Sequence, residues 1–343
     1  MLSLLRPHPG PLHEFCLMPD LADILNAQQK LEGVASRTPL LSFPSLNEQL
    51  GGQVFFKAEC LQRKGAFKFR GAYNALCNLS EAERAGGVVA CSSGNHAQGV
   101  AEAARLFGVD AAIVMPQDAP SVKVEGTKAA GAEVIFYDRY SEDREAIARA
   151  LCEERGACFI HPFNDPNIMA GQGTLALEIS EDLISMDLVP DKVLVPVSGG
   201  GLAAGVSVAI HGSFPDCKII ACEPVGHDDL AASLEVGQPV ETENTRDGDE
   251  PSLCDALLAP QPGNLTFEVL KDHVSSVATA NNNDVLQAMA FAMKQMHLIV
   301  EPGGAIGLAA LLSGAVQLDG GVAVVILSGG NADPELLQKV LRL

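Results

Sequence analysis

Three short segments of the sequence place a reactive or hydrogen-bonding side chain beside glycine. Lys68 stands between two phenylalanines in KGAFKFRGA (64–72), where an amine either extends from a packed surface or is desolvated for Schiff-base chemistry. Hydroxyl, amide and imidazole groups follow one another in SSGNH (92–96), and one more serine begins SGGN (328–331). Such groups bind a carboxylate or cap a helix, so the segments fit a ligand site and also fit structural roles.

A fourth segment, VPVSGGGLAAG (195–205), carries three consecutive glycines between an expected strand and an expected helix. Backbone N–H groups of such a loop can approach an anion closely, and the helix N-terminus adds its positive dipole end, so we predict a phosphate site. Gly199, Gly201 and Ala204 also fit the G-x-G-x-x-A dinucleotide fingerprint. Because Glu223 follows a strand about 20 residues later, the loop alone also fits an NAD-dependent dehydrogenase.

The elements that position these segments alternate between short apolar runs and Ala-rich helical stretches, as in α/β proteins with parallel sheets. SSGNH, SGGGL and SGGN then follow directly on strands, at the carboxyl ends where such proteins bind ligands, and Lys68 lies at the entry to a helix. The strands are expected at residues 52–57, 87–91, 110–115, 133–137, 158–161, 192–197, 218–222 and 322–327. The helices are expected at 67–79, from SSGNH to 107, at 122–130, 141–154 with Ser141 as N-cap, 171–184, 283–297 and 304–313.

The alternation predicts two domains, as expected for 343 residues. A compact βαβαβαβ unit at 87–161 is expected to form a small substrate-side domain, inserted into a larger cofactor-binding domain made of 18–86 and 162–343. Residues 1–17 are interpreted as an N-terminal extension, because their apolar part is too short for a signal peptide. We expect the active site between the two domains.

Composition and charge exclude several classes of function. With 43 acidic and 23 basic residues the formal charge is −20, which argues against nucleic-acid and anionic-membrane partners. Hydrophobic residues make up 47% and charged residues 19%, which fits a folded globular protein, and no apolar run is long enough to cross a membrane. Nine cysteines without a CxxC pair favour a reducing, cytoplasmic compartment.

Taken together and in this order, KGAFKFRGA, SSGNHAQGVA, VPVSGGGLAAG, EPGGAIGLAA and LSGGN resemble the serine/threonine dehydratase and serine racemase family of pyridoxal-phosphate enzymes. The resemblance covers residues 22–337. It implies an α/β protein of fold type II, in which each of two domains has an open, mostly parallel sheet flanked by helices. It also implies pyridoxal 5'-phosphate as the cofactor, a small amino acid as the substrate and a homodimer as the assembly.

The resemblance assigns a role to each matching residue of the cofactor site. Lys68 would carry the cofactor as a Schiff base and remove the substrate α-proton, and Ser93 would be a second acid or base on the opposite face. Phe67 would stack under the ring, and Asn95 would hold its phenolic oxygen. Ser328 would hydrogen-bond the pyridine nitrogen, and a neutral partner there favours elimination over transamination. The phosphate would be bound by Ser198, Gly199, Gly200, Gly201 and Leu202.

The substrate pocket is less sharply defined by the sequence. The resemblance places the substrate carboxylate on Ser92, Asn95 and His96. Arg144 matches an arginine of serine racemases and could pair with a second carboxylate, which would indicate a 3-hydroxyaspartate. The alternative is a solvated arginine in an i to i+4 pair. Because SLCDA (252–256) departs from the T-I-A-D-G of relatives on the substrate side, specificity for threonine or serine does not carry over by name.

A cation site is also implied by the resemblance. Relatives that need magnesium or calcium bind it through a Glu, a backbone carbonyl and an Asp spaced as Glu223, His227 and Asp229 are here, and hard oxygen ligands suit Mg²⁺ and Ca²⁺. The alternative is structural: Glu223 closes a strand, and Asp228 and Asp229 cap a helix.

These observations lead us to expect a threonine/serine dehydratase, an ammonia-lyase that converts a β-hydroxy amino acid to a 2-oxo acid and ammonia. A 3-hydroxyaspartate dehydratase and a serine racemase are the alternatives within the family. Outside it stand an NAD-dependent dehydrogenase and a non-catalytic binding module. Because the sequence carries no regulatory extension like that of isoleucine-inhibited threonine dehydratases, we expect no inhibition by isoleucine.

Overall fold

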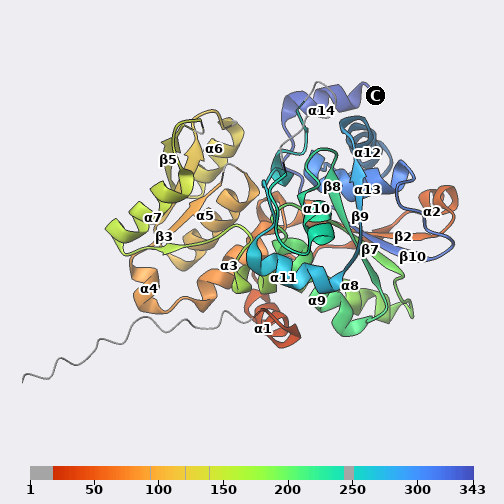
Figure 1. Cartoon of the computed structure of the whole chain (residues 1–343), viewed down its shortest axis with the longest axis horizontal. Helices are drawn as coiled ribbons and strands as arrows, with labels where there is room; N and C mark the ends of the chain where they lie inside the picture. The colour runs from red at the N-terminus through yellow and green to blue at the C-terminus, as the bar shows by residue number, and fades with distance from the viewer. Residues whose placement is uncertain (1–17, 93, 120, 139, 243–250) are drawn as a thin grey trace, which may run out of the picture.

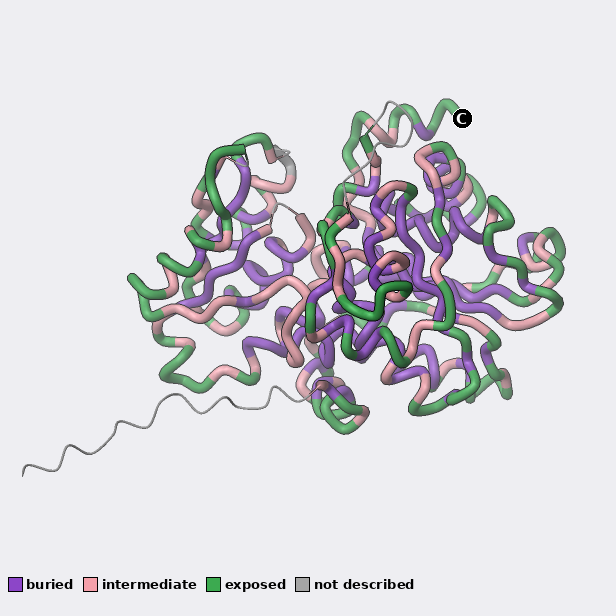
Figure 2. Tube along the Cα trace, in the orientation of Figure 1, coloured by how far each residue is buried: buried purple, intermediate pink, exposed green. Residues whose placement is uncertain are grey.

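The computed structural model describes residues 18–92, 94–119, 121–138, 140–242 and 251–343. Two open sheets organise these residues, and each sheet is flanked by helices (Figure 1). Figure 2 shows buried residues concentrated in the central strands and in the helices packed against them, with exposed residues on the outer helices and loops. The predicted α/β fold with two mostly parallel sheets is therefore confirmed.

The larger sheet has the strand order β1-β2-β10-β7-β8-β9. Only the pair of β1 and β2 is antiparallel among its described strand pairs. Alternate residues of each strand face opposite sides, so that Val324 and Ile326 enter one core cluster and Ala323 and Val325 the other. The strands are β1 (Leu40–Ser42), β2 (Gln53–Lys57), β7 (Lys192–Pro196), β8 (Lys218–Pro224), β9 (Val274–Ala280) and β10 (Val322–Ile326).

Helices bury both faces of this six-stranded sheet. One layer consists of α1 (Leu21–Leu31), α8 (Pro166–Ser185), α9 (Gly201–Ser213) and α11 (Asn264–His273). The other layer consists of α2 (Pro44–Leu50), α12 (Asn282–Gln295), α13 (Pro302–Leu312) and α14 (Pro334–Leu341). The short connections η1 (Glu59–Leu61), η2 (Arg63–Gly65) and η3 (Asp255–Leu257) are 3₁₀ helices, and α10 (Asp229–Val236) follows β8.

The smaller sheet has the order β5-β4-β3-β6, and all its strand pairs are parallel. Helices α5 and α6 pack on one face and α7 on the other, while α4 precedes the first strand. The strands are β3 (Val88–Cys91), β4 (Ala111–Pro116), β5 (Glu133–Tyr137) and β6 (Cys158–Phe159). The helices are α4 (Glu81–Ala85), α5 (Asn95–Phe107), α6 (Ser121–Ala129) and α7 (Arg144–Arg155).

Helix α3 (Lys68–Asn78) lies between the two sheets and packs against both α5 and α8 (Figure 1). Glycines make these contacts possible. A Cβ on Gly171 would lie 2.6 Å from the Cα of Gly71, and a Cβ on Gly99 would lie 3.1 Å from the carbonyl carbon of Lys68. The backbones therefore touch directly, and Lys68, the first residue of α3, is fixed at the boundary between the sheets.

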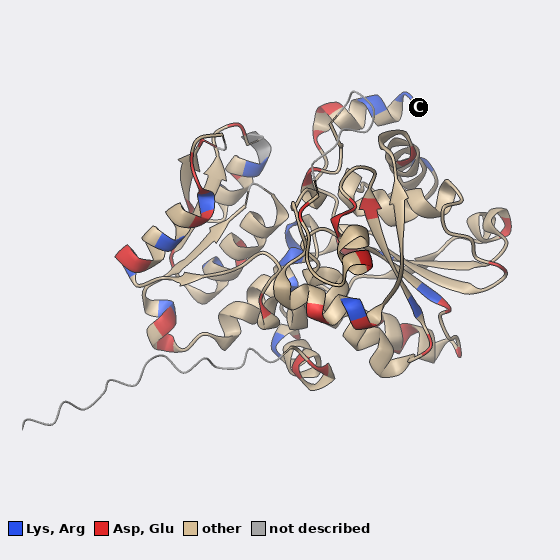
Figure 3. Ribbon diagram, viewed as in Figure 1, with Lys and Arg blue, Asp and Glu red and all other residues tan. Residues whose placement is uncertain are grey.

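Buried charges anchor the same helix on its other side. Figure 3 shows most charged residues on helices and loops, whereas the strands are largely uncharged. Arg70 of α3 is an exception: it is 1% exposed and donates to Glu59 Oε1 at 2.8 Å and to Glu178 Oε1 at 2.7 Å. Lys57 of β2 donates to Glu178 as well, and burial lowers the pKa of its amine. These four residues tie α3 to β2, η1 and α8.

The expected strands are all present, with ends that differ by one to two residues. Several expectations differ from the structure. Ser141 does not cap α7, because the helix begins at Arg144 and Asp143 accepts from the N–H groups of Glu145 and Ala146. Helix α8 begins at Pro166, five residues before the expected start. The elements that were not expected are β1, β9, α1, α2, α4, α11 and α14. The boundaries at 87 and 161 stay a prediction, and no described helix is long and apolar enough to cross a membrane.

Candidate active site

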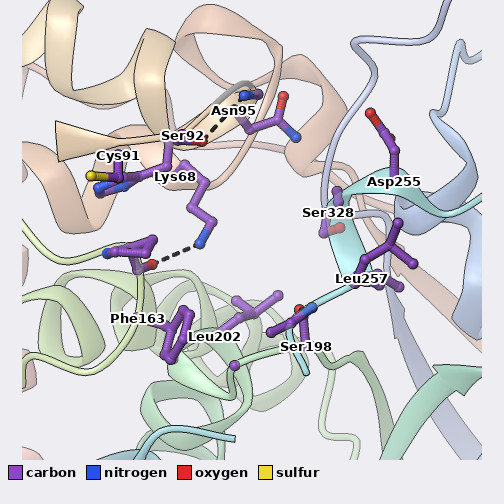
Figure 4. Close-up of a pocket in the computed structure, with 18 of the residues that line it drawn as sticks. Lys68, Cys91, Ser92, Asn95, Phe163, Ser198, Leu202, Asp255, Leu257 and Ser328 are labelled. Carbon is purple, nitrogen blue, oxygen red and sulfur yellow. Dashed lines mark hydrogen bonds between the residues drawn. The ribbon is translucent and has the colours of Figure 1, made fainter. Parts of the chain in front are cut away.

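A cavity of about 290 Å³ opens where the carboxyl ends of both sheets meet (Figure 4). This is the edge at which α/β proteins bind ligands. Its lining includes every described residue that the sequence assigned to a cofactor or substrate. These are Phe67, Lys68, Ser92, Asn95, His96, Arg144, Ser198, Gly199, Gly200, Gly201, Leu202 and Ser328. Ser93, the predicted second acid or base, lies outside the described residues.

The amine of Lys68 points into this cavity (Figure 4). Its Nζ donates to the carbonyl oxygen of Pro162 at 2.7 Å and lies 5.2 Å from the centre of the Phe67 ring. Burial lowers the pKa of the amine to about 8. At pH 7 about a tenth of such amines are uncharged, against fewer than one in a thousand for an ordinary lysine. Lys68 is therefore suited to act as a nucleophile and as a base.

The glycine loop provides an anion site at the start of α9. Gly200, the N-cap, has a φ of 93°, which favours glycine, and a Cβ on Gly199 would lie 2.4 Å from the Phe163 ring. The first N–H groups of an α-helix lack partners within the helix and carry its positive dipole end. The Ser198 hydroxyl accepts from the N–H of Ala259 at 3.1 Å, which leaves its own proton for a ligand. This loop can therefore bind a phosphate.

A neutral hydroxyl faces the cavity from the six-stranded sheet. Ser328 follows β10 and is 5% exposed, and its side chain points toward the same open space as Lys68 (Figure 4). Its carbonyl oxygen accepts from the N–H of Phe67 at 3.1 Å, which fixes the start of α3 against the end of β10. The amine and the hydroxyl are thus held in one rigid frame although 260 positions separate them in the sequence.

The described residues of SSGNH form the opposite wall of the cavity. Ser92 Oγ accepts from the N–H of Gly94 at 3.2 Å, and α5 begins at Asn95. His96 is 2% exposed, and its Nε2 lies 2.9 Å from the carbonyl oxygen of Ile160. Burial, with a contribution from Lys68, lowers the pKa of His96 to about 3, so the ring is neutral and its proton is on Nε2. The Nδ1 atom is then an acceptor and cannot donate to a carboxylate.

Arg144 reaches the cavity from the first turn of α7. It is exposed at the surface but lines the cavity, and its carbonyl oxygen accepts from Cys91 Sγ at 3.1 Å. Arg144 makes no ion pair with another described residue. The i to i+4 pair on this helix joins Glu145 and Arg149 instead. The structural alternative for Arg144, an i to i+4 pair, is therefore not observed among the described residues.

The sequence matches the family model described as "Pyridoxal-phosphate dependent enzyme" over residues 31–329. The chain belongs to this family. It is 41% identical to an L-threonine ammonia-lyase of Thermotoga maritima over 94% of this chain and 78% of the relative. It is also 41% identical to an L-threo-3-hydroxyaspartate ammonia-lyase of a Pseudomonas species, over 93% of this chain and 98% of the relative.

Among solved structures of the family, maize serine racemase superposes with a TM-score of 0.86 at 37% identity. The alignment covers 95% of this chain and 98% of the racemase. Both sheets are therefore shared with that structure. The dinucleotide interpretation of the glycine loop does not hold, because the family binds pyridoxal phosphate. Glu223, which that interpretation required, accepts from the N–H groups of Leu230 and Ala231 of α10 and does not line the cavity.

The cavity fits the cofactor of a pyridoxal-phosphate enzyme. The partly uncharged Lys68 amine can react with its aldehyde, and the start of α9 can bind its phosphate. The loop leaves no room for side chains at Gly199 and Gly201, since a Cβ on either would lie within 3 Å of Phe163. Ser328 offers a neutral hydroxyl group to the same cavity. Membership of the family and these contacts agree on one site.

The sequence did not single out several cavity residues. Glu301, the N-cap residue of α13, is 2% exposed, and burial raises the pKa of its carboxyl to about 7. Lys123 of α6 forms an ion pair with Asp255 of η3. Both residues line the cavity, so this pair connects the side of the smaller sheet to the side of the larger one. Phe163 packs under the glycine loop. For Glu301 the sequence did contain a signal, because an acidic residue at the start of the apolar run EPGGAIGLAA is expected to be buried.

The predicted cation site lies away from the cavity lining. Glu223 and Asp229 are both buried, and burial raises the pKa of the two carboxyls to about 8 and about 7. The Glu223 carboxylate accepts from the N–H groups of Leu230 at 3.0 Å and Ala231 at 3.2 Å, whereas the side chain of Asp228, the N-cap residue of α10, makes no capping hydrogen bond. Within the described residues no group of three or more His, Cys, Asp or Glu could hold a metal ion. The cation site is thus not supported by a ready set of ligands.

Proposed function

We propose that this protein is an ammonia-lyase that converts threonine or serine to a 2-oxo acid and ammonia. The observation that carries the proposal is the pairing, in one cavity, of the Lys68 amine with the neutral Ser328 hydroxyl. A neutral group beside the ring nitrogen limits electron withdrawal by the cofactor and favours elimination over transamination. The name of the Thermotoga maritima relative, L-threonine ammonia-lyase, supports the same activity.

The residues of the cavity divide the work of this reaction. When bound, the cofactor withdraws electrons from the substrate α-carbon and so acidifies its hydrogen. The uncharged Nζ of Lys68 accepts that proton. Ser198 and the first N–H groups of α9 would hold the phosphate, Phe67 would pack against the ring, and Asn95 would donate to the phenolic oxygen.

We propose that the substrate carboxylate binds to Ser92 and to the start of α5. The Ser92 hydroxyl can donate to it, since Ser92 Oγ accepts only from Gly94 among the described residues. The N–H groups at the start of α5 add further donors. At His96 the contact comes from the backbone N–H, because the imidazole keeps its only proton for Ile160.

The overall reaction is balanced without an oxidant or a reductant. The substrate loses its α-proton, which Lys68 accepts, and its β-hydroxyl. Together the proton and the hydroxyl account for the one water released, and an enamine remains. After release, the enamine tautomerises to an imine, and one water molecule hydrolyses the imine. The net products from threonine are 2-oxobutanoate and ammonia, and those from serine are pyruvate and ammonia.

A substrate panel tests this proposal. The purified, cofactor-saturated protein is incubated with L-threonine, L-serine and the stereoisomers of 3-hydroxyaspartate, and 2-oxo acid and ammonia are measured together. We expect equal amounts of both products from threonine or serine, with a kcat in the ordinary enzyme range of about 1–1,000 s⁻¹. Turnover confined to 3-hydroxyaspartate, or no turnover of any panel member, would sink it.

A 3-hydroxyaspartate is the second candidate substrate, because Arg144 lines the cavity and forms no ion pair with another described residue. A guanidinium there can pair with a second carboxylate in a bidentate manner. The matching relative from Pseudomonas is named for this substrate. Arg144→Ala should then lower kcat/KM for 3-hydroxyaspartate by about 100-fold and leave threonine within about twofold. Arg149→Ala, on the exposed side of the same helix, is the matched control.

Racemisation is the third activity to test, and it depends on Ser93. A second acid or base on the face opposite Lys68 would return the α-proton with inverted configuration. If Ser93 has this role, the wild-type protein forms D-serine from L-serine and Ser93→Ala does not, while elimination persists. Formation of D-serine by the variant at the wild-type rate would remove Ser93 from this role.

The cation proposal rests on two buried carboxyl groups, Glu223 and Asp229, of which Asp229 has no hydrogen-bond partner for either oxygen among the described residues and contributes to the raised pKa of Glu223. With the His227 carbonyl they would offer oxygen ligands to Mg²⁺ or Ca²⁺. We expect either ion to raise the melting temperature of the wild type by a few degrees and to leave Asp229→Asn unchanged. Equal melting temperatures in EDTA and in millimolar Mg²⁺ or Ca²⁺ would exclude the site.

Assembly and compartment complete the proposal. We propose a homodimer, which light scattering on the eluted protein would show as a mass twice that of the 35.9 kDa chain. A monomeric mass would contradict it. We also propose a reducing cytoplasmic compartment, supported by eight described cysteines that are all free.

A further inference from the structure

Glu301 is a buried carboxyl of the cavity to which the proposed reaction gives no role. It is the N-cap residue of α13, but its side chain does not cap that helix. The carboxylate instead accepts from Asn95 Nδ2. A group that is 2% exposed and charged needs such partners to offset its loss of water, so this contact is structurally significant.

Asn95 is held from its other side by Asn331. The Nδ2 group of Asn331 donates to the carbonyl oxygen of Lys64 and to Asn95 Oδ1, each at 2.8 Å. These contacts settle which end of each amide carries the nitrogen. Because the Lys64 carbonyl only accepts hydrogen bonds, Asn331 must face it with its NH₂ group, and this same group donates to Asn95 Oδ1, which leaves Asn95 Nδ2 on the side of Glu301. The amide of Asn95 therefore has one possible orientation.

Gly329, which follows Ser328, makes room for this arrangement. A Cβ on Gly329 would lie 1.9 Å from Glu301 Oε1 and 3.1 Å from Asn95 Nδ2. The Glu301 N–H also donates to the carbonyl oxygen of Gly329 at 2.9 Å. The SGGN segment thus contributes three times to one site: Ser328 faces the cavity, Gly329 leaves space for the carboxylate, and Asn331 orients Asn95.

We propose that Glu301 and Asn331 are positioning residues that fix the Asn95 amide with one N–H directed at the phenolic oxygen of the cofactor. Asn95 Nδ2 has two protons, and Glu301 accepts one of them. Without its two partners the amide would rotate and would present its oxygen to the cofactor in part of the molecules. Glu301 and Asn331 then act on cofactor binding through Asn95 alone. The inference rests on the proposed contact between Asn95 and the cofactor.

The test measures cofactor affinity, which does not depend on the substrate. Apo-protein is titrated with pyridoxal phosphate, and both the dissociation constant and the visible absorption maximum of the bound cofactor are recorded. The variants are Asn95→Ala, Glu301→Ala, Glu301→Gln and Asn331→Ala, together with the double variant Asn95→Ala/Glu301→Ala. The melting temperature of each apo-protein reports whether the variant is folded.

We expect Glu301→Ala and Asn331→Ala each to weaken affinity by about tenfold and to shift the absorption maximum. Glu301→Gln should stay within about twofold of the wild type, because its amide oxygen can accept from Asn95. In the Asn95→Ala background, Glu301→Ala should change the dissociation constant little further. Such non-additivity is expected if Glu301 acts through Asn95. If Glu301→Ala does not fold, Asn331→Ala combined with Asn95→Ala must show the same lack of additivity.

Two results would overturn the inference. They differ in whether the proposed contact between Asn95 and the cofactor is also lost. If Asn95→Ala binds the cofactor as the wild type does, the proposed contact of Asn95 fails and the inference fails with it. If Asn95→Ala weakens binding while Glu301→Ala and Asn331→Ala do not, or if their effects add to that of Asn95→Ala, only the positioning role is lost. Neither result depends on which amino acid the protein deaminates.

Discussion

The amine of Lys68 takes its reactivity from its surroundings. Burial beside Phe67 lowers its pKa to about 8 from the 10.5 of a free lysine. The uncharged form, which attacks an aldehyde, therefore grows tenfold per pH unit up to about pH 8 and is constant above it. We predict that the rate of cofactor attachment to the apo-protein follows this curve in stopped-flow absorbance. A rate that still rises tenfold per unit between pH 9 and 10 would contradict it.

At the scale of single residues, the sequence predicted most residues of the cavity lining, because the motifs are recognised from the types and order of their residues. Every described residue assigned to the cofactor or the substrate lines one cavity. Glu301 was missed because its role depends on Asn95, and 206 positions separate the two. The tautomer of His96 was likewise beyond the sequence, since the carbonyl oxygen of Ile160, 2.9 Å from Nε2, decides which ring nitrogen carries the proton.

The glycine loop acts as an element, because its conformation depends on Phe163 as well as on its own residues. A methyl group on Gly199 would lie 2.4 Å from the Phe163 ring and displace the loop. We predict that Gly199→Ala weakens cofactor binding at least tenfold, measured by titration of the apo-protein. Phe163→Ala in the same chain should restore part of the affinity by making room. Unchanged affinity in Gly199→Ala would show that the loop does not bind the phosphate.

Helix α3 is held by the buried charges of Arg70, Glu59, Glu178 and Lys57. Removing one member leaves the others without compensation, which costs about 3–5 kcal/mol. Arg70→Ala should lower the free energy of unfolding in urea by that amount. Arg37 pairs with Glu181 and Asp182 of α8 at a half-exposed site, so Arg37→Ala should cost no more than about 1 kcal/mol. Equal costs for the two variants would contradict this difference.

Elements were predictable where their pattern was local. The strands of the small sheet are short apolar runs bounded by glycine or proline, and each was found within two residues. Strand β9 was missed because VSSVATA has few apolar residues and lies at the edge of the sheet beside β8 alone. Asp143 rather than Ser141 caps α7, since both residue types fit an N-cap and only the backbone path decides between them.

At the scale of the whole molecule, the cavity lies between the two sheets, and residues from both line it. Ser92 and Asn95 come from the four-stranded sheet, whereas Ser198 and Ser328 come from the six-stranded sheet. A cofactor held by both stabilises the folded chain, by about 2.7 kcal/mol at a hundredfold excess over its dissociation constant. We predict a higher melting temperature with pyridoxal phosphate and a smaller rise with pyridoxal, which lacks the phosphate. Equal rises would show that the start of α9 adds nothing.

The central claim is that Lys68 carries the cofactor, and one measurement tests it most directly. The cofactor-loaded protein is reduced with borohydride, digested, and its peptides are identified by mass spectrometry. We predict the pyridoxyl group on the peptide that contains Lys68, and its absence from Lys68→Ala treated in the same way. A pyridoxyl group on another lysine of the wild type, or on none, would contradict the account.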